Sequence, residues 1–194
     1  MYRTLKRLYS LTEGENTIAA FQKLWAEEDK QVLQRLGVFP DITPALVTSK
    51  VPPAAKLLIK RHEGFSPKAY RCPSGIWTVG WGFTQIHGRP VTEQDTLTEA
   101  EAEVLLDAEL ERLAEEVDRL VNVPLNPNQL SALISFVYNV GLNAFAKSTL
   151  LKRINAQDPK ASEEFDRWVN GANGPLPGLV KRRAEERALY EAKP

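Results

Sequence analysis

Apolar residues recur at helical spacing near the start of the chain. They predict one amphipathic helix over about residues 14–36, and Gly37 follows where a helix would end. The apolar residues of this pattern are Ile18, Phe21, Leu24, Trp25, Val32, Leu33 and Leu36. Four prolines then occur between residues 39 and 53, where they limit helix and remove backbone donors. We therefore predict that residues 1–50 form an N-terminal helical extension with a proline-containing linker, and that residues 51–194 form a second domain.

The second domain opens with the pattern of a short helix followed by a hairpin. Pro53 suits the first helical position, where its missing N–H costs nothing, and Gly64 suits the position just after the last turn. From Lys68 to about Thr84, β-branched and aromatic residues alternate among glycines and a proline. This pattern predicts two or three short strands.

The remainder of the domain has helical periodicity. Thr98 and Glu101 have the spacing of a capping box, and apolar residues recur over residues 102–120 in a pattern typical of a long helix. Asn126 and Pro127 open another helix that Gly141 ends, and further helices are predicted over residues 143–155, 159–170 and 177–192. The predicted fold class is therefore α+β, mostly helical, with one small sheet near the start of the second domain.

Composition and charge exclude several classes of protein. The chain of 194 residues has a formal net charge of zero and a pI of about 6.8, so no overall field attracts it to nucleic acid. No run of about 18 apolar residues could span a bilayer, and the basic start of the chain lacks the apolar middle of a signal peptide. A single cysteine allows no internal disulfide, which is typical of synthesis in a reducing cytosol.

Three chemically distinct residues fall close together around the predicted helix end and hairpin. Glu63 ends the helix, Cys72 lies at the predicted turn, and Thr78 lies on the returning strand. A carboxylate at the C-terminal end of a helix meets the negative end of the helix dipole, which favours the protonated form that a general acid needs. The pattern therefore predicts a catalytic site here.

These residues resemble a known signature. The sequence Glu63-Gly64, then Tyr70-Arg71-Cys72, then Gly75-Ile76-Trp77-Thr78-Val79-Gly80-Trp81-Gly82 is similar to that of the phage-type lysozymes, or endolysins, of glycoside hydrolase family 24. The intervals of nine and six residues between the three candidates match that family. Two positions depart from it, because Cys72 replaces an aspartate and Phe83 replaces a histidine.

The resemblance continues to the C-terminus and covers the chain from about Val51. It includes the segments Asn126-x-Asn128-Gln129, Ser135-Phe136-x-x-Asn139-x-Gly141, Ser148-Thr149-Leu150-Leu151 and Pro177-Gly178-Leu179-Val180-x-Arg182-Arg183. It implies a lysozyme-like fold. Residues 1–50 lie outside it.

The resemblance implies catalytic roles for the three candidates. Glu63 would be the general acid, and Cys72 would activate water as a base, giving inversion, or attack the sugar directly, giving retention. A thiol with a pKa of about 8.5 is mostly neutral at pH 7, and Arg71 and Lys68 nearby can lower that value. Thr78 would hold the water, although a threonine also suits a strand by propensity alone.

Other residues are candidates for binding substrate. Trp77 and Trp81 can stack on sugar rings or belong to the core, and the amides of Gln129 and Asn139 can bond N-acetyl groups or the hairpin wall. The basic run at residues 181–187 contains interleaved glutamates, which predicts a solvated helix face. Two histidines and one cysteine show no metal-ligand spacing, so neither a metal nor a cofactor is expected.

The resemblance implies a muramidase that cleaves the β-1,4 bond between N-acetylmuramic acid and N-acetylglucosamine in bacterial peptidoglycan. It would lyse the host of a phage or prophage, waiting in the host cytoplasm until a holin permeabilises the membrane and then acting on the periplasmic wall. The departures at Cys72 and Phe83 leave open a peptidoglycan-binding pseudo-enzyme. The N-terminal helix leaves open a protein partner, as in a virion-associated wall-degrading component.

Overall fold

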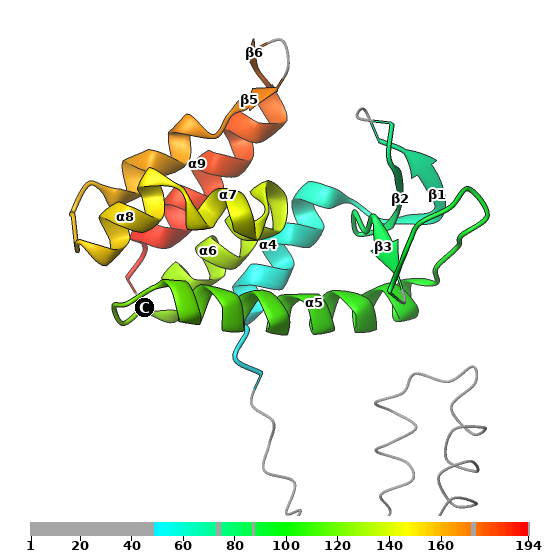
Figure 1. Cartoon of the computed structure of the whole chain (residues 1–194), viewed down its shortest axis with the longest axis horizontal. Helices are drawn as coiled ribbons and strands as arrows, with labels where there is room; N and C mark the ends of the chain where they lie inside the picture. Colours follow the sequence, from blue (N-terminus) through cyan, green and yellow to red (C-terminus); the bar gives the residue numbers. More distant parts are fainter. Residues whose placement is uncertain (1–48, 73–74, 87, 172–173, 194) are drawn as a thin grey trace, which may run out of the picture. The chain divides into compact units, whose positions relative to one another are not determined.

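The computed structural model describes residues 49–72, 75–86, 88–171 and 174–193 (Figure 1). All of them belong to one compact unit, Ser49–Pro194. The helix predicted over residues 14–36 and most of the proline-containing linker lie outside the described residues. The division of the chain at residue 50 therefore stays a prediction. Within the described part, no helix is long and apolar enough to cross a membrane.

Helix α4 (Pro53–Glu63) matches its predicted bounds. Proline occupies its first position, and it buries Ala55, Leu58 and Ile59 against helix α6. Gly64 ends the helix with φ of +66°, a conformation that disfavours other residues, and donates its N–H to the Lys60 carbonyl at 3.2 Å. The helix end therefore places Glu63 at a fixed point beside the first hairpin.

Two small antiparallel strand pairs follow α4; the first corresponds to the strands predicted over residues 68–84, whereas the second lies beyond that range. Strand β1 (Ser66–Arg71) pairs with β2 (Trp77–Gly80), with Tyr70 opposite Thr78 and an irregular register between Ser66 and Tyr70. Strands β3 (Gln85–Ile86) and β4 (Arg89–Pro90) form the second pair. Figure 1 shows both pairs together at one end of the long helix α5.

Helix α5 (Glu99–Leu120) begins with the predicted capping box. The Thr98 hydroxyl accepts from the Glu101 N–H at 3.2 Å, and the Glu101 carboxylate accepts from the Thr98 N–H at 2.8 Å. Its buried face repeats at helical spacing and consists of Ala102, Leu106, Leu110, Leu113, Ala114 and Val117. This helix packs against α4 and α6.

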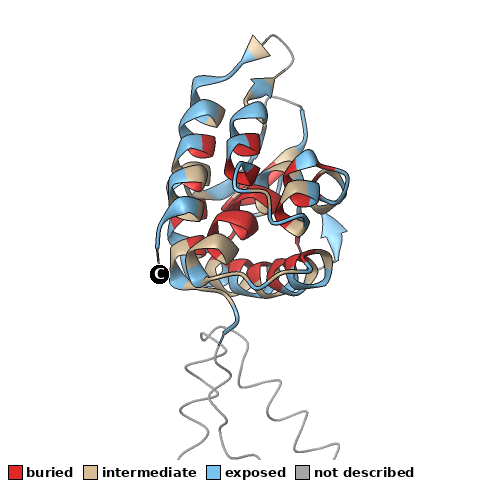
Figure 2. Ribbon diagram, turned by 90° about the vertical axis from the view of Figure 1, so that its left-hand side faces the viewer, coloured by how far each residue is buried: buried red, intermediate tan, exposed pale blue. Residues whose placement is uncertain are grey.

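Helix α6 (Pro127–Val140) is the centre of the packing. It lies against α4, α5 and α9, and all seven residues from Ser131 to Val137 are buried. Figure 2 shows buried residues gathered on this central helix and on the faces that surround it. Because apolar and small residues surround its whole circumference, the helix has no solvated face in its middle.

The C-terminal third differs from the predicted elements in three places. The helix predicted over residues 143–155 is two helices, α7 (Leu142–Ala146) and α8 (Thr149–Asn155). Residues 159–170 contain a 3-10 helix, η1 (Ala161–Arg167), followed by an unpredicted strand β5 (Asn170–Gly171) that pairs with β6 (Gly174–Pro175). The last helix, α9 (Pro177–Glu191), matches its prediction within one residue.

The break between α7 and α8 has a local cause. Ser148 has an extended backbone, and its hydroxyl accepts from the Leu151 N–H at 3.0 Å, so it caps α8 instead of continuing α7. Its burial among apolar residues also favours the satisfied cap. Despite these differences, the predicted α+β class with small antiparallel pairs is confirmed.

Candidate active site

Glu63 lies where α4, α9 and the hairpin region meet. Its side chain is 22% exposed, and its Oε1 accepts a hydrogen bond from Arg182 Nη1 of α9 at 2.5 Å. Arg182 is itself only 3% exposed. A buried, charge-assisted bond of this kind holds the carboxylate in one direction.

The other side of the Glu63 carboxylate meets the backbone of Gly82. This glycine has φ of +96°, and a Cβ placed on it would lie 2.9 Å from Glu63 Oε2. Any larger residue would therefore be strained by its backbone and would displace the carboxylate. The glycine of the motif is needed for this close approach.

Cys72 lies at the end of β1, just before the turn of the hairpin. Its N–H donates to the Ile76 carbonyl at 3.0 Å, and its own carbonyl accepts from the Gly75 N–H at 2.8 Å. The residue is half-buried. These bonds fix the backbone on both sides of the turn and keep the thiol in the hairpin wall.

Thr78 lies on β2, opposite Tyr70 of β1. It is 4% exposed, and its hydroxyl donates to the Ile76 carbonyl at 3.2 Å. The hydroxyl oxygen still has acceptor capacity, because a hydroxyl can accept while it donates. The strand pairing therefore places Thr78 in the same hairpin wall as Cys72.

Two tyrosines report the negative charge of this region. Partial burial, together with the charges of Glu63 and of the Cys72 thiolate, raises the pKa of Tyr70. Deep burial raises the pKa of Tyr138 further, and the Glu63 charge adds to that rise. Tyr70 therefore lies within electrostatic range of both Glu63 and Cys72.

Tyr138 joins α6 to the hairpin region. Its hydroxyl donates to the Trp81 carbonyl at 2.8 Å, next to Gly82. No role was predicted for either tyrosine from sequence. Tyr70 belongs to the matched motif, which was an available signal, whereas Tyr138 had no local signal because its partner is 57 residues away.

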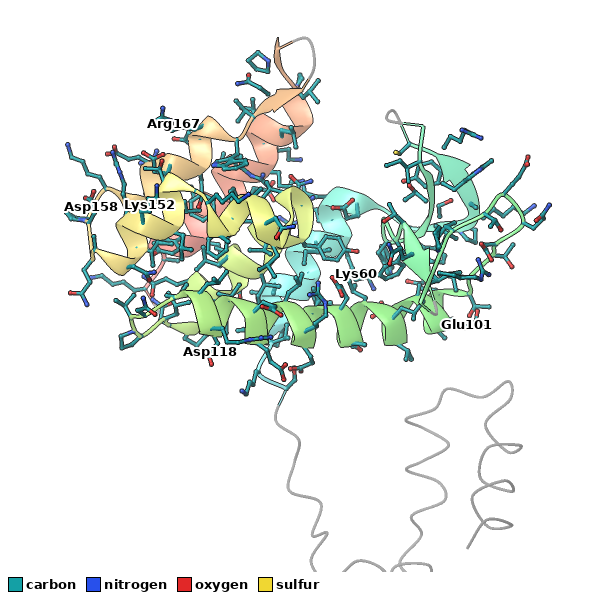
Figure 3. All side chains as sticks on the ribbon, in the orientation of Figure 1. Lys60, Glu101, Asp118, Lys152, Asp158 and Arg167 are labelled. Carbon is teal, nitrogen blue, oxygen red and sulfur yellow. The ribbon has the colours of Figure 1, made fainter. Side chains whose placement is uncertain are left out.

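The two candidate tryptophans have different surroundings. Trp77 is half-buried, and the Arg71 guanidinium lies 4.8 Å from its ring centre. Trp81 is 6% exposed and packs on Phe65 with ring centres 5.0 Å apart. The Lys60 ammonium lies 4.4 Å from the Trp81 ring centre, and Figure 3 shows Lys60 on the side of α4 that faces the hairpins.

The two candidate amides lie at opposite ends of α6. Gln129 completes the capping box at the start of the helix, where its Oε1 accepts from the Asn126 N–H at 3.0 Å. It also lines a separate cavity of about 470 Å³ beside the end of α9. Asn139, at the other end, is exposed, and its Oδ1 accepts from Arg183 Nη1 at 3.0 Å. The structure therefore brings Asn139, but not Gln129, into the neighbourhood of Glu63.

The prediction of a solvated face for residues 181–187 is wrong for three of them. Arg182, Arg183 and Glu186 are 3%, 0% and 0% exposed. Burial raises the pKa of Glu186 and lowers that of Arg183, and their mutual attraction opposes both shifts. Charges can be buried in this way only when they are paired, and the spacing of three and four residues between arginine and glutamate was the available signal.

A cavity of about 620 Å³ opens beside Gly82. It is formed by the β3 region and α5, and it is lined by Gly82, Phe83, Thr84, Gln85, Ile86, Leu105, Ala108, Glu109, Arg112 and Tyr138. Gly82 lines this cavity and also lies against the Glu63 carboxylate, whereas Glu63 is not one of the lining residues. Among the residues that the structure describes, no group of three acidic, histidine or cysteine side chains could hold a metal ion.

Comparison with known proteins identifies the family. The family model described as Phage lysozyme matches residues 60–186, which contain Glu63 and the buried arginines. The endolysin of Acyrthosiphon pisum secondary endosymbiont phage 1 is 43% identical over 141 residues, covering 70% of this chain and 94% of that protein. The endolysin of Salmonella phage P22 is 38% identical over 134 residues, covering 68% of this chain and 91% of that protein.

Solved structures show the same similarity. The muramidase domain of SpmX from Asticaccaulis excentricus has a TM-score of 0.66 and 34% identity, covering 74% of this chain and 98% of that chain. A P22 lysozyme mutant has a TM-score of 0.64 and 35% identity, covering 73% and 98%.

The chain therefore belongs to the phage lysozyme family, and its enzyme class is that of the lysozyme-type glycoside hydrolases. It is a phage muramidase of host cell lysis, as the sequence predicted.

Proposed function

We propose that this enzyme cleaves the β-1,4 bond between N-acetylmuramic acid and N-acetylglucosamine with Glu63 as its general acid. One observation carries the proposal: the Glu63 carboxylate is held by Arg182 and lies against Gly82, and Gly82 also lines an open cavity. Glu63 gives its proton to the leaving oxygen as the bond from that oxygen to the sugar carbon breaks. The positive charge that develops on the sugar is then available to a nucleophile from the opposite face.

Glu63→Gln tests the acid directly. The amide keeps the size of the side chain but has no carboxylic proton to transfer, so we expect the rate of lysis to fall at least 1,000-fold, about the upper range of general acid catalysis. Turbidity loss of permeabilised bacteria and release of reducing ends measure it. Glu185→Gln is the control, because Glu185 contacts His62, the residue next to Glu63, but has no proposed catalytic role. Wild-type rates in the Glu63 variant would contradict the assignment.

Cys72 and Thr78 are proposed to manage the second half of the reaction. In the inverting course, the Thr78 oxygen accepts a hydrogen bond from a water, the Cys72 thiolate takes a proton from that water, and the hydroxide oxygen bonds to the sugar carbon. In the retaining course, the thiolate sulfur bonds to the sugar carbon, and a second water, deprotonated by the Glu63 carboxylate, later displaces it. Nuclear magnetic resonance of the first product distinguishes them: an α-anomer indicates inversion and a β-anomer retention.

The thiol chemistry predicts sensitivity to alkylation. Since Cys72 is the sole cysteine of the sequence, a thiol-specific reagent has one target, and we expect it to abolish wild-type lysis. Cys72→Asp supplies a carboxylate base, as in the family pattern, and should keep activity while resisting the reagent. Cys72→Ser should lose at least tenfold, because a serine hydroxyl stays protonated at neutral pH. Full activity of alkylated enzyme would remove Cys72 from the mechanism.

Substrate contacts are proposed at the rim of the same region. Trp77 offers a half-buried ring, and Asn139 an exposed amide, to the N-acetylated sugars. The described contacts of Trp81 and Gln129 instead serve packing and helix capping, so we expect these two residues to contribute less to substrate binding than Trp77 and Asn139. Alanine at Trp77 or Asn139 should raise KM more than it lowers kcat.

The place of action is proposed from the family to which the chain belongs. We infer that the enzyme waits in the host cytoplasm and reaches the periplasmic wall once the membrane is permeabilised. Residues 1–48 precede the family match, which begins at residue 60, and we infer that they supply a contact with a protein partner rather than catalysis.

A further inference from the structure

A fully buried carboxylate lies behind the catalytic acid. Glu186 of α9 is 0% exposed, yet the mechanism gives it no part in the chemistry. Its Oε1 accepts from the Ser135 hydroxyl at 2.7 Å, from Arg182 Nε at 3.1 Å and from Arg183 Nη2 at 2.8 Å. Its Oε2 lies 2.6 Å from Arg183 Nε. Four contacts from three side chains leave this carboxylate a single orientation.

Each of the two arginines that contact Glu186 also donates a hydrogen bond to a residue of the candidate site. Arg182 holds Glu186 with Nε and Glu63 with Nη1, and its Nη2 donates to the Ser135 carbonyl at 3.2 Å. Arg183 holds Glu186 with one side of its guanidinium and Asn139 with Nη1, and it stacks 5.0 Å from the Phe136 ring centre. Glu186 is therefore the common anchor of the catalytic acid and of the exposed amide.

We propose that Glu186 is a positioning residue that orients Glu63 and Asn139 through the two arginines and offsets the positive charge of those arginines beside Glu63. This inference rests on the proposed role of Glu63 as general acid. It assigns Glu186 no contact with substrate.

The charges of Arg182, Arg183 and Glu186 act strongly on Glu63 because these three groups are buried. Two guanidinium groups near a carboxyl favour its ionised form, and a general acid that ionises too easily is inactive at neutral pH. Glu186 places one negative charge between those two positive charges, in a region where water does not screen them. With both carboxylates ionised, the four groups Glu63, Arg182, Glu186 and Arg183 together carry no net charge.

Other charged groups around Glu63 come from every element packed on it. Tyr70 of β1 and Tyr138 of α6 lie within electrostatic range of the carboxyl. The three basic residues in the last turn of α4 have other partners: Lys60 pairs with Glu103, and Arg61 and His62 contact Glu185 at 3.3 and 3.0 Å. The arginines of α9 are therefore the nearest described cations whose charge Glu186 can offset.

Asn139 is also held in position through Arg183. The bond from Arg183 fixes the Asn139 oxygen toward α9, so the amide donors face away from that helix. An amide held in this way can donate to an acetamido carbonyl of the substrate with little loss of side-chain entropy. When Arg183 loses its anchor, substrate binding should weaken with it.

The test is the pH profile of kcat/KM in Glu186→Gln, measured on a soluble peptidoglycan oligosaccharide with the full chain. Removing the buried negative charge should move the alkaline limb to lower pH by about one unit, because Glu63 then ionises more easily. Arg183→Gln removes one cation and should move the limb to higher pH, with KM raised as in Asn139→Ala. Glu186→Asp keeps the charge, so its limb should stay at the wild-type pH even if kcat falls.

Glu185→Gln is the matched control, since it removes the same charge from the neighbouring residue of α9 and should leave the limb unmoved. A folded Glu186→Gln enzyme whose limb coincides with wild type would overturn the proposal. If that variant does not fold, a limb that is unmoved or lowered in Arg183→Gln would overturn it instead. Full activity of Glu63→Gln would overturn the acid assignment itself, which separates the two failures.

Discussion

At the residue scale, the carboxylate of Glu63, the proposed general acid, is held between two contacts. Arg182 attracts Glu63 Oε1 at 2.5 Å, whereas the backbone of Gly82 limits how far Oε2 can move. Neither contact alone defines a position, because a long glutamate side chain has several rotamers of similar energy. Together they hold the carboxylate against Gly82, which also lines the cavity of about 620 Å³.

Gly82→Ala should therefore damage catalysis more than stability. The new methyl group would lie 2.9 Å from Glu63 Oε2 and would move that flexible carboxylate, and φ of +96° adds backbone strain. We expect kcat to fall by about 10- to 100-fold, the scale of a 1 Å misplacement. Gly178→Ala is the control, since a Cβ there meets no atom within 4 Å and no positive φ opposes it. Equal kcat in both variants would show that Gly82 does not position the acid.

At the element scale, one residue, Asp95, ties the loop after β4 both to Arg89 of β4 and to the first hairpin. Asp95 accepts two hydrogen bonds from the Arg89 guanidinium, at 2.9 and 2.6 Å, and two from Thr92. Its backbone carbonyl accepts from the Ala69 N–H of β1 at 3.0 Å. The Arg89 bonds and the Thr92 bonds hold the pKa of Asp95 well below its ordinary value.

This lowered pKa gives a pH dependence of stability with a definite sign. A carboxyl whose pKa is lower in the folded state stabilises the protein above its unfolded value, about 4, and loses that contribution as the pH falls toward the folded value. Asp95→Asn should therefore lower Tm at pH 7, and the gap to wild type should narrow at pH 3. Glu93→Gln, in the same loop and exposed, should show no such change. A gap of constant size would indicate that the charge of Asp95 does not matter.

At the scale of the whole molecule, the site depends on segments that are distant in sequence. Helix α4 supplies Glu63, the first hairpin supplies Cys72 and Thr78, and helix α9 supplies the arginines 119 residues after the acid. All of these segments belong to the unit Ser49–Pro194, and helix α6 packs between α4 and α9. The core on that side is built around Phe136, which has Phe145, Phe165 and Trp168 within 6.2 Å between ring centres.

Removal of residues 1–48 tests the proposed division of labour. The shortened chain retains every described contact of the site, so we expect it to lyse permeabilised bacteria within about twofold of the full chain. Loss of binding to a protein partner, but not to isolated peptidoglycan, is the expected change in pull-down assays. Loss of catalysis with an intact thermal transition would assign the extension to the active enzyme instead.

The sequence by itself determined the parts of this protein that depend on near neighbours. Thr98 with Glu101, Asn126 with Pro127, and Gly64 are start and stop signals whose physical action spans three or four residues, and the helices α5, α6 and α4 begin or end where they predict. The intervals between Glu63, Cys72 and Thr78 likewise identified the family. These features could be predicted because backbone capping is local.

Only the tertiary structure decided where charges are buried. Arg182, Arg183 and Glu186 look like a solvated helix face in sequence, because local periodicity contains no information about partners 44 to 119 residues away. The same reason applies to the short pair β5–β6, whose strands have two residues each and too little pattern to predict. Glu63 could be identified from the sequence, whereas its bond from Arg182 and the bond of Arg182 to Glu186 became apparent only in the structure, where α9 packs against α6.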